Sequence, residues 1–432
     1  MALLHYRYGA YLSKEQVAEI VAPDPDTLKL IGSWLKYHGV APSNVSTSHG
    51  GSWLAVTGVP VLKANDLLGA SYQLYWHAGT NETIIRTVGY ALPAVLHGLV
   101  RTVAPTTFFG SPGTIRQTSR KRTRGAVLSY PKPITPSHLR WLYKTEGYTI
   151  AAADKNLLAV TGFHGEYASN DDLTEFMRRY RIDAKGPTFD VEEINNGGYN
   201  FENPGKEANT DMQLAQAMTW PTPHVFYSIG GLPEFVPDSL QPMNNNEPYL
   251  DWLDYMTELQ SVPQTISSSY SGNEQTFPPD YARSVCELFG QLGARGVSII
   301  FSSGNQGVGG GDCKKNDGSD VVQFQPTFPP TCTFGFSLAS KQVQIRVTHQ
   351  SCTHYSYHAG PYVTSVGGTT GRYVEVAASL SSGGFSNVFE RPKYQADALP
   401  TYFRRLRGKH AGLYKWARFR DRMWPILTLR FI

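Results

Sequence analysis

Two carboxylic acids at helical spacing are the clearest candidates for chemistry in this sequence. Glu207 and Asp211 lie four residues apart in segment 205–214, which follows a loop rich in Gly, Asn and Pro and has the pattern of a helix start. Both carboxylates therefore project from one helix face, near the positive end of the helix dipole. The pair is either two solvated acids or a coupled dyad in which one acid is a base and the other orients it.

A glycine-rich turn supplies the third candidate, Asn305. The apolar residues 299–301 predict the end of a buried strand, and Ser303-Gly304-Asn305 follows them directly. Polar side chains at this end of a parallel strand lie where ligands bind and where donors stabilise an oxyanion. A phosphate loop is the alternative, but no Gly-Lys-Ser or Gly-Lys-Thr follows the glycines. We therefore interpret Asn305 as a hydrogen-bond donor.

The elements that must hold these residues alternate between strand and helix. Buried-strand patterns occur at 156–162, 224–228, 264–267 and 296–301, and helical patterns at 170–177 and 280–293. This alternation predicts an α/β fold with a doubly wound parallel sheet. Residues 1–110 differ, because a capping box at Ser13 and Gln16 precedes interleaved helix and strand patterns that predict a ferredoxin-like α+β unit.

Composition and charge exclude several classes of protein. The 432 residues are 41% hydrophobic and 17% charged, and no run of about 18 apolar residues occurs, so we expect no membrane helix. Residues 403–432 hold nine Lys and Arg against one Asp, so the net positive charge of this segment alone exceeds the net charge of +4 of the whole chain. The body is therefore mildly acidic, and no nucleic-acid surface is expected. Residues 1–7 lack the apolar core of a signal peptide.

Two further features bear on processing and compartment. Segment 111–129 carries five basic residues and no acid, so it is either a solvated loop or a site of proteolytic processing. Cys313 and Cys332 flank a Gly-rich loop and are candidates for a disulfide in a secreted protein, whereas Cys286 fits a helix equally well as a small buried apolar residue. Sequons at Asn44 and Asn81 also favour a secreted glycoprotein.

Motifs in one order along residues 8–414 resemble the sedolisin family of serine-carboxyl peptidases, and most closely its fungal secreted tripeptidyl-peptidases. They include Ser-Lys-Glu-Gln-Val (13–17), Gly-Gly-Ser-Trp-Leu (50–54), Glu-Ala-Asn-Thr-Asp (207–211), Phe-Ser-Ser-Gly (301–304), Pro-Thr-Phe-Pro (326–329) and Ser-Gly-Gly-Phe-Ser-Asn (382–387). The resemblance implies a propeptide at 1–110, an activation linker at 111–129 and a subtilisin-like peptidase domain at 130–414. It also implies a secreted, monomeric zymogen that acts on peptide or protein substrates.

Residue roles follow from the same resemblance. Glu207 matches the general base that takes the proton of a serine, and Asp211 matches the acid that orients it. A carboxylate base remains able to accept a proton at an acidic pH at which His would already be protonated. Asn305 stands where the family has an oxyanion Asp, and its amide is still a hydrogen-bond donor.

Departures from the family pattern support an alternative. The nucleophile motif Ser-Gly-Thr-Ser-Ala is absent, and Ser271-Gly272-Asn273 replaces the acidic pair expected after Tyr270. The Asp-rich segment that binds calcium in the family is missing as well, so no residue here is assigned to a metal. Segment 333–360 interrupts the match and basic segment 415–432 replaces its continuation, which suggests gene-model errors. One interpretation is an acid tripeptidyl-peptidase precursor; the alternative is a truncated, catalytically inactive homologue.

Overall fold

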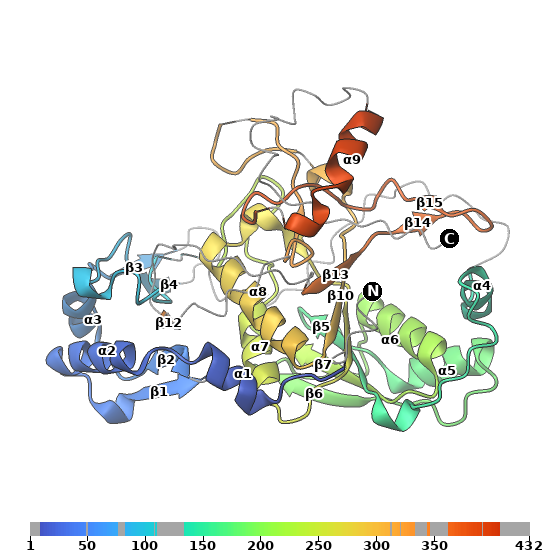
Figure 1. Cartoon of the computed structure of the whole chain (residues 1–432), viewed down its shortest axis with the longest axis horizontal. Coiled ribbons are helices and arrows are strands. Elements are labelled where there is room, and N and C mark those ends of the chain that lie inside the picture. The colour runs from blue at the N-terminus through green and yellow to red at the C-terminus, as the bar shows by residue number, and fades with distance from the viewer. Residues whose placement is uncertain are drawn as a thin grey trace.

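A parallel sheet of six strands positions the candidate residues. The computed structural model describes residues 9–48, 51–76, 83–107, 109, 134–311, 313–319, 321–332, 344–345, 362–390 and 392–406. The strands are β5 (Leu158–Phe163), β6 (Asp190–Ile194), β7 (His224–Ile229), β8 (Thr265–Ser268), β10 (Ser298–Ser302) and β13 (Val363–Val366). They pair in the order β13-β10-β8-β5-β7-β6, and every pair is parallel (Figure 1). The predicted doubly wound α/β fold is confirmed.

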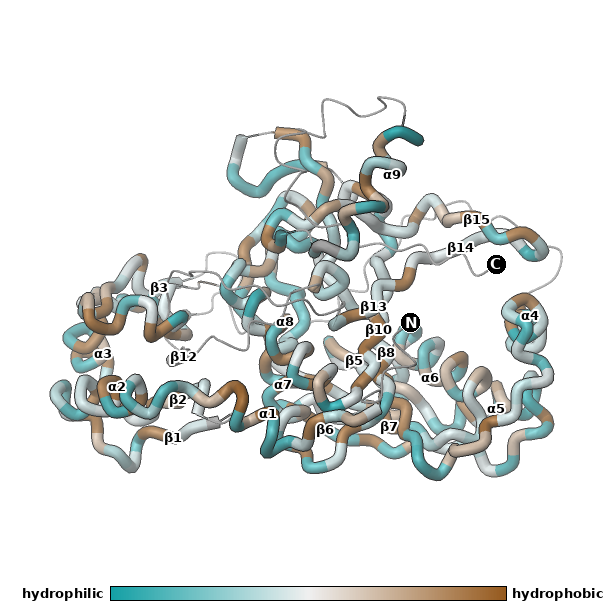
Figure 2. The backbone as a smooth tube through the Cα atoms, in the orientation of Figure 1, coloured by the Kyte–Doolittle hydropathy of each residue, from teal (hydrophilic) through white to brown (hydrophobic). Residues whose placement is uncertain are grey.

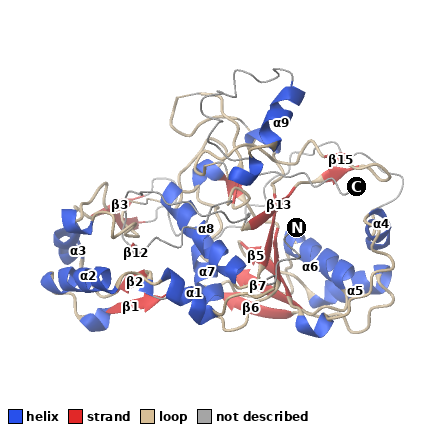
Figure 3. Cartoon of the chain, in the orientation of Figure 1, coloured by secondary structure: helices blue, strands red, loops and turns tan. Residues whose placement is uncertain are grey.

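Helices cover both faces of this sheet. Helices α5 (Asn170–Tyr180) and α6 (Lys206–Thr219) lie on one face, and α7 (Tyr249–Glu258) and α8 (Pro279–Ala294) lie on the other (Figure 3). Successive strand residues point to opposite faces. Val225 and Tyr227 of β7 accordingly join the core under α7 and α8, whereas Phe226 between them joins the core under α5 and α6. Figure 2 shows hydrophobic residues gathered along these strands.

Burial explains which strands the sequence patterns detect. The four apolar runs correspond to β5, β7, β8 and β10, with bounds that differ by at most two residues. Every residue of β7 is buried, as expected of a central strand. Strand β6 has no such pattern because it forms an edge of the sheet and exposes Asp190 and Glu193. Acids on an edge strand also discourage pairing with other chains.

The N-terminal unit, residues 9–107, is a separate α+β layer. Its elements are α1 (Lys14–Val21), α2 (Pro25–Tyr37), β1 (Val45–Ser48), β2 (Trp53–Val56), α3 (Val61–Leu68), β3 (Gln73–Trp76) and β4 (Thr83–Arg86). The strands form two antiparallel pairs, β1 with β2 and β3 with β4. The predicted capping box is present, because the Ser13 hydroxyl accepts from Gln16 N and the Gln16 side chain accepts from Ser13 N.

Polar contacts join the N-terminal unit to α7, to the loop after α7 and to α8. Leu12 N–H donates to the carbonyl oxygen of Ala294 at 3.0 Å. Lys14 Nζ lies 2.9 Å from Glu258 Oε2, and the buried Arg101 pairs with Glu287 on α8 at 2.5 Å. We call this set, together with the hydrogen bond from Gln260 to Glu15, the interunit contact.

Smaller elements lie around the ends of the sheet. They are α4 (Pro136–Leu142), β9 (Gly272–Asn273), β11 (Thr327–Phe328), β14 (Thr369–Thr370), β15 (Val376–Ala377) and α9 (Ala398–Leu406). Segments 111–129 and 415–432 lie outside the described residues. Of segment 333–360, only β12 (Gln344–Ile345) is described, and it pairs with β2 of the N-terminal unit. Among the described helices, none has the length and apolar character needed to cross a bilayer.

The disulfide expectation is wrong. Cys332 pairs with Cys286 of α8, and their Cα atoms lie 5.3 Å apart, so the expected bond between Cys332 and Cys313 does not form. Both bonded cysteines are fully buried in the core under α7 and α8. Packing of the segment after β11 against α8 brings together two residues that are 46 positions apart.

Candidate active site

Glu207 and Asp211 occupy the first turns of α6, as their spacing predicts. The helix starts after Gly205, and the Glu166 carboxylate accepts from the backbone N–H of Glu207 at 3.0 Å and of Ala208 at 3.4 Å. Glu166 lies on the loop after β5 and thereby satisfies donors that a helix start leaves open. Position 205 has room only for glycine, because a Cβ atom there would lie 2.6 Å from Glu166 Oε2.

Asp211 is held in an environment that favours its neutral form. Its Oδ1 atom accepts a hydrogen bond from the Ser269 hydroxyl at 2.9 Å, and its Oδ2 atom is buried without a hydrogen bond to any described residue. Burial raises the pKa of Asp211 to about 7; the negative charges of Glu207 and Glu166 act in the same direction and the Ser269 hydrogen bond opposes it. Asp211 is therefore not a solvated acid, and the negative charge of Glu207 acts on it.

Asn305 lies at the same edge of the sheet, on the exposed turn after β10. The end of β10 is joined to the Asp211 contact, because the Ser302 hydroxyl donates to the carbonyl oxygen of Ser269 at 3.1 Å. We call this the carboxyl edge, since it is formed by the carboxyl ends of the strands. The structure thus brings all three predicted residues to the end of the sheet where doubly wound folds bind ligands.

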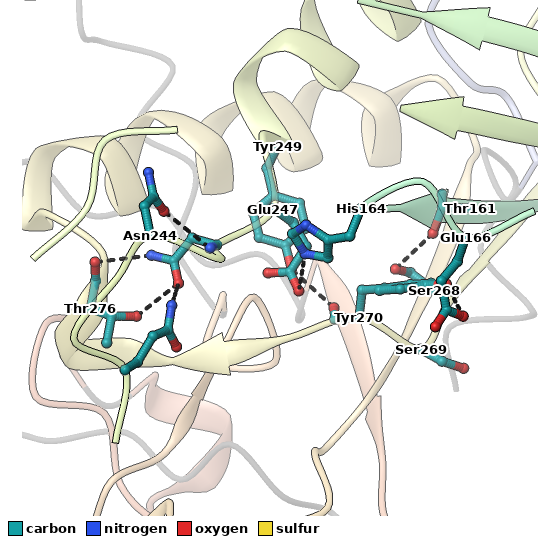
Figure 4. A network of polar contacts seen from close by, with 12 residues as sticks. Thr161, His164, Glu166, Asn244, Glu247, Tyr249, Ser268, Ser269, Tyr270 and Thr276 are labelled. Carbon is teal, nitrogen blue, oxygen red and sulfur yellow. Dashed lines mark hydrogen bonds and ion pairs between the residues drawn. The ribbon is translucent and has the colours of Figure 1, made fainter. Parts of the chain in front are cut away.

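A polar network surrounds Tyr270, the residue that follows Ser269 (Figure 4). The Tyr270 hydroxyl donates to Glu166 at 3.4 Å, and the Tyr270 carbonyl accepts from the Tyr249 hydroxyl at 3.0 Å. Tyr249 also donates to Glu247, which lies 3.4 Å from the ring of His164. Carboxyl groups in this network are therefore fixed by neutral hydroxyl and amide donors, apart from the contact with His164.

Sequence reasoning missed Glu166, Ser269 and Tyr270. Each follows the end of a predicted strand, Glu166 by four residues and Ser269 by two. Polar residues directly after buried strands were therefore the available signal. Their contact with α6 spans 41 positions for Glu166 and 58 for Ser269, so sequence proximity does not reveal it.

A metal centre is not found in the described part of the chain. No group of three or more His, Cys, Asp or Glu residues there could hold an ion. Calcium, which the family resemblance implies, needs several carboxylate and carbonyl oxygens around one point. No cluster of carboxylates that could form the core of such a set is found among the described residues, and no chemical step is assigned to calcium.

Comparison with known proteins finds relatives that are named as tripeptidyl-peptidases. Residues 3–109 match the family model described as "Pro-kumamolisin, activation domain". The chain is 34% identical over 425 residues to Tripeptidyl-peptidase SED2 of Arthroderma otae and 35% identical over 430 residues to Tripeptidyl-peptidase SED3 of the same fungus. These alignments cover 94% and 95% of this chain. The chain belongs to the sedolisin family.

The match to these sedolisin relatives covers only part of their length. The chain spans 66% of each of the two Arthroderma proteins, which is slightly less than two thirds. A solved structure, a Pseudomonas sedolisin complexed with pseudo-iodotyrostatin, covers 62% of this chain at 13% identity and a TM-score of 0.38. The N-terminal unit corresponds to the activation domain of the family, since the matched residues 3–109 include it.

Proposed function

We propose that this chain is a sedolisin-type tripeptidyl-peptidase precursor that acts on peptides with free N-termini at acidic pH. The observation that carries the proposal is the pair of coupled acids at the carboxyl edge. Asp211 has a pKa raised to about 7 by burial and sits one helical turn from Glu207. Two acids in such different environments can hold different protonation states at one pH, which acid–base catalysis needs.

The proposed division of roles follows from this asymmetry. Below about pH 6 the Asp211 carboxyl is mostly protonated and acts as a hydrogen-bond donor. In this role it orients Glu207, whose carboxylate then accepts the proton of an attacking hydroxyl. Asn305 supplies an amide N–H at the carboxyl edge for the oxyanion that forms on the substrate carbonyl. A His base would already be protonated under these conditions.

One sequence observation favours a second candidate function. The 432 residues contain no Ser-Gly-Thr-Ser-Ala motif, so they supply a base, an orienting acid and an oxyanion donor without a recognisable nucleophile. Covalent acyl transfer requires that nucleophile. The second candidate is therefore a protein that binds peptides at the same edge without cleaving them.

A single assay separates the two functions. The full chain is incubated between pH 3 and 6 with a fluorogenic tripeptide-arylamide, and binding of a C-terminally labelled peptide with a free N-terminus is measured in parallel. Turnover that Glu207→Ala abolishes supports the peptidase, and binding without turnover supports the second function. Glu202→Ala, which changes an exposed acid on the loop before α6, is the control and should alter neither result. Failure of both turnover and binding would refute both functions.

Secretion, glycosylation and zymogen processing also belong to the proposal. We propose that the chain is secreted as a monomer, carries glycan at Asn44 or Asn81, and is cleaved within 111–129. Asn44 is only half-buried and ends a short helical turn before β1, which leaves the sequon near the surface. Expression in a secreting host, followed by glycosidase treatment and N-terminal sequencing, tests these points. A secreted product without a glycan or a cut in 111–129 would contradict them.

A further inference from the structure

Glu274 is a buried carboxyl group that the proposed mechanism does not use. It is fully buried in the short helical turn that follows β9. Its two carboxyl oxygens accept from the Ser386 hydroxyl and from Asn387 N–H, each at 2.6 Å. A carboxyl group without solvent normally pairs with a cation, whereas both of these partners are neutral. Such an arrangement calls for an explanation beyond packing.

The segment tied by Glu274 is itself fixed around Ser386. The Ser386 hydroxyl oxygen accepts from the backbone N–H of Phe389 at 2.8 Å and of Val388 at 3.1 Å. The backbone N–H of Glu274 donates to the carbonyl oxygen of Pro326 at 2.9 Å. Glu274 therefore joins two segments that are remote in sequence, one before β11 and one after β15.

These two segments hold the turn that carries Asn305 from both sides. Next to Pro326, the Thr327 hydroxyl donates to the carbonyl oxygen of Ser303 at 2.7 Å. On the other side, Ser382 N–H donates to the carbonyl oxygen of Gly304 at 3.0 Å, and the Ser382 hydroxyl accepts from Gln306 N–H at 3.1 Å.

The turn is packed too tightly against both segments to accommodate a displacement of either one. Gly304 adopts a φ of 93°, and a Cβ atom there would lie 2.8 Å from Thr327 and 2.9 Å from the Ser382 hydroxyl. A shift of either neighbour would therefore move the backbone on both sides of residue 305. An oxyanion donor must lie within a few tenths of an ångström of its working position.

We propose that Glu274 is a positioning residue, which holds the turn carrying Asn305 by joining the two segments that flank it. The hydrogen bonds of the described residues give Glu274 only neutral contacts, and burial raises the pKa of its carboxyl. The neutral carboxyl therefore maintains the arrangement at acidic pH, and ionisation at higher pH places an uncompensated charge at the junction. The inference rests on the proposed function for the role of residue 305.

Hydrogen exchange of the full chain tests the proposal without requiring turnover. Protection of segments 303–307 and 380–389 is measured at pH 5 and pH 8 by mass spectrometry and corrected for intrinsic exchange, with β5 as the internal reference. We expect protection of both segments to be lower at pH 8 than at pH 5, because the ionised Glu274 carboxylate would have only the neutral partners Ser386 and Asn387. Glu274→Gln keeps the shape of the side chain and should remove this pH dependence. Glu274→Ala should lower protection of both segments at either pH.

The control is Asp238→Asn, at a second buried acid with amide donors, including Asn273 at 3.0 Å. It should leave the pH response of the turn as in the unmodified chain. Equal protection of the turn at pH 5 and pH 8, or a pH response that persists in Glu274→Gln, would overturn the proposal. A failure here would leave the peptidase proposal intact, because the assay does not measure catalysis. Absence of turnover would likewise not affect this result.

Discussion

The carboxyl edge and the interunit contact hold acidic side chains in opposite ways. At the carboxyl edge, Asp211 and Glu274 are removed from water among neutral donors, and burial raises the pKa of both carboxyls. At the interunit contact, Glu258 and Glu287 lie beside the cations of Lys14 and Arg101. A hydrogen bond from Gln260 lowers the pKa of Glu15 there to about 2. One region of the molecule is arranged for protonated acids and the other for ionised acids.

This difference gives the two regions opposite responses to pH. A raised carboxyl pKa contributes stability at low pH, and that contribution is lost as the pH rises toward the raised value. A lowered carboxyl pKa contributes stability at neutral pH, and that contribution is lost as the pH falls from the usual carboxyl pKa toward the lowered one, which for Glu15 is about 2. Acidification therefore favours the carboxyl edge while weakening the attachment of the N-terminal unit.

The largest expected effect comes from Asp211→Asn. The folded state loses stability as the pH rises from about 4 to about 7, because Asp211 then ionises in a buried site. A pKa difference of this size between the folded and unfolded states corresponds to a loss of stability of ~4 kcal/mol at most. The variant should match the unmodified chain near pH 4 and have a higher free energy of unfolding at pH 8. Urea unfolding at several pH values measures this, and equal stabilities at pH 8 would contradict it.

His224, at the amino end of β7, has a pKa that burial shifts in the direction opposite to that of Asp211. Its ring nitrogens contact Thr219 Oγ1 at 3.0 Å and the Thr222 carbonyl oxygen at 2.8 Å, and burial lowers its pKa to about 4. Stability is therefore lost as the pH falls from about 6.5 to 4, by ~3 kcal/mol. In the Asp211→Asn variant this loss should appear as a clear decrease in the free energy of unfolding as the pH falls. Adding His224→Gln should remove that decrease. A decrease that persists in the double variant would show that groups other than His224 cause it.

The interunit contact should show smaller, salt-dependent couplings. Arg101 is buried, so a double-mutant cycle with Arg101→Met and Glu287→Gln should give a coupling of about 1–2 kcal/mol. The pair of Lys14 and Glu258 is more exposed, and the matched cycle with Lys14→Met and Glu258→Gln should give at most about 0.5 kcal/mol. Both couplings are obtained from the free energies of unfolding of the unmodified chain, the two single variants and the double variant of each pair. These are measured at pH 7 in low and high salt. A larger coupling for the exposed pair would contradict the comparison.

The sequence predicts the parts of the site that depend on local periodicity. Helical spacing places Glu207 and Asp211 on one face, and the apolar run before Asn305 places that residue at a strand end. The same logic predicts the parallel sheet, because buried strands have continuous apolar runs. The two edge strands, β6 and β13, escape it, since each has residues exposed to solvent.

Contacts between segments that are far apart along the chain could not be predicted from the sequence. Glu166 reaches the start of α6 from the loop after β5, and Ser269 reaches Asp211 from the end of β8. The disulfide expectation fails for the same reason, because Cys332 meets Cys286 only when the segment after β11 packs on α8. Burial of Asp211, which sets its pKa, is likewise a property of the assembled sheet and helices.

The most direct test of the account is the titration of Asp211 itself. The full chain is labelled with ¹³C at the aspartate carboxyls, and Asp211→Asn identifies its resonance in spectra recorded from pH 3 to 8. We expect a midpoint near pH 7. We also expect a lower midpoint in Glu207→Gln, where one neighbouring negative charge is removed. A midpoint near pH 4 that Glu207→Gln does not change would contradict the coupled pair and the role proposed for it.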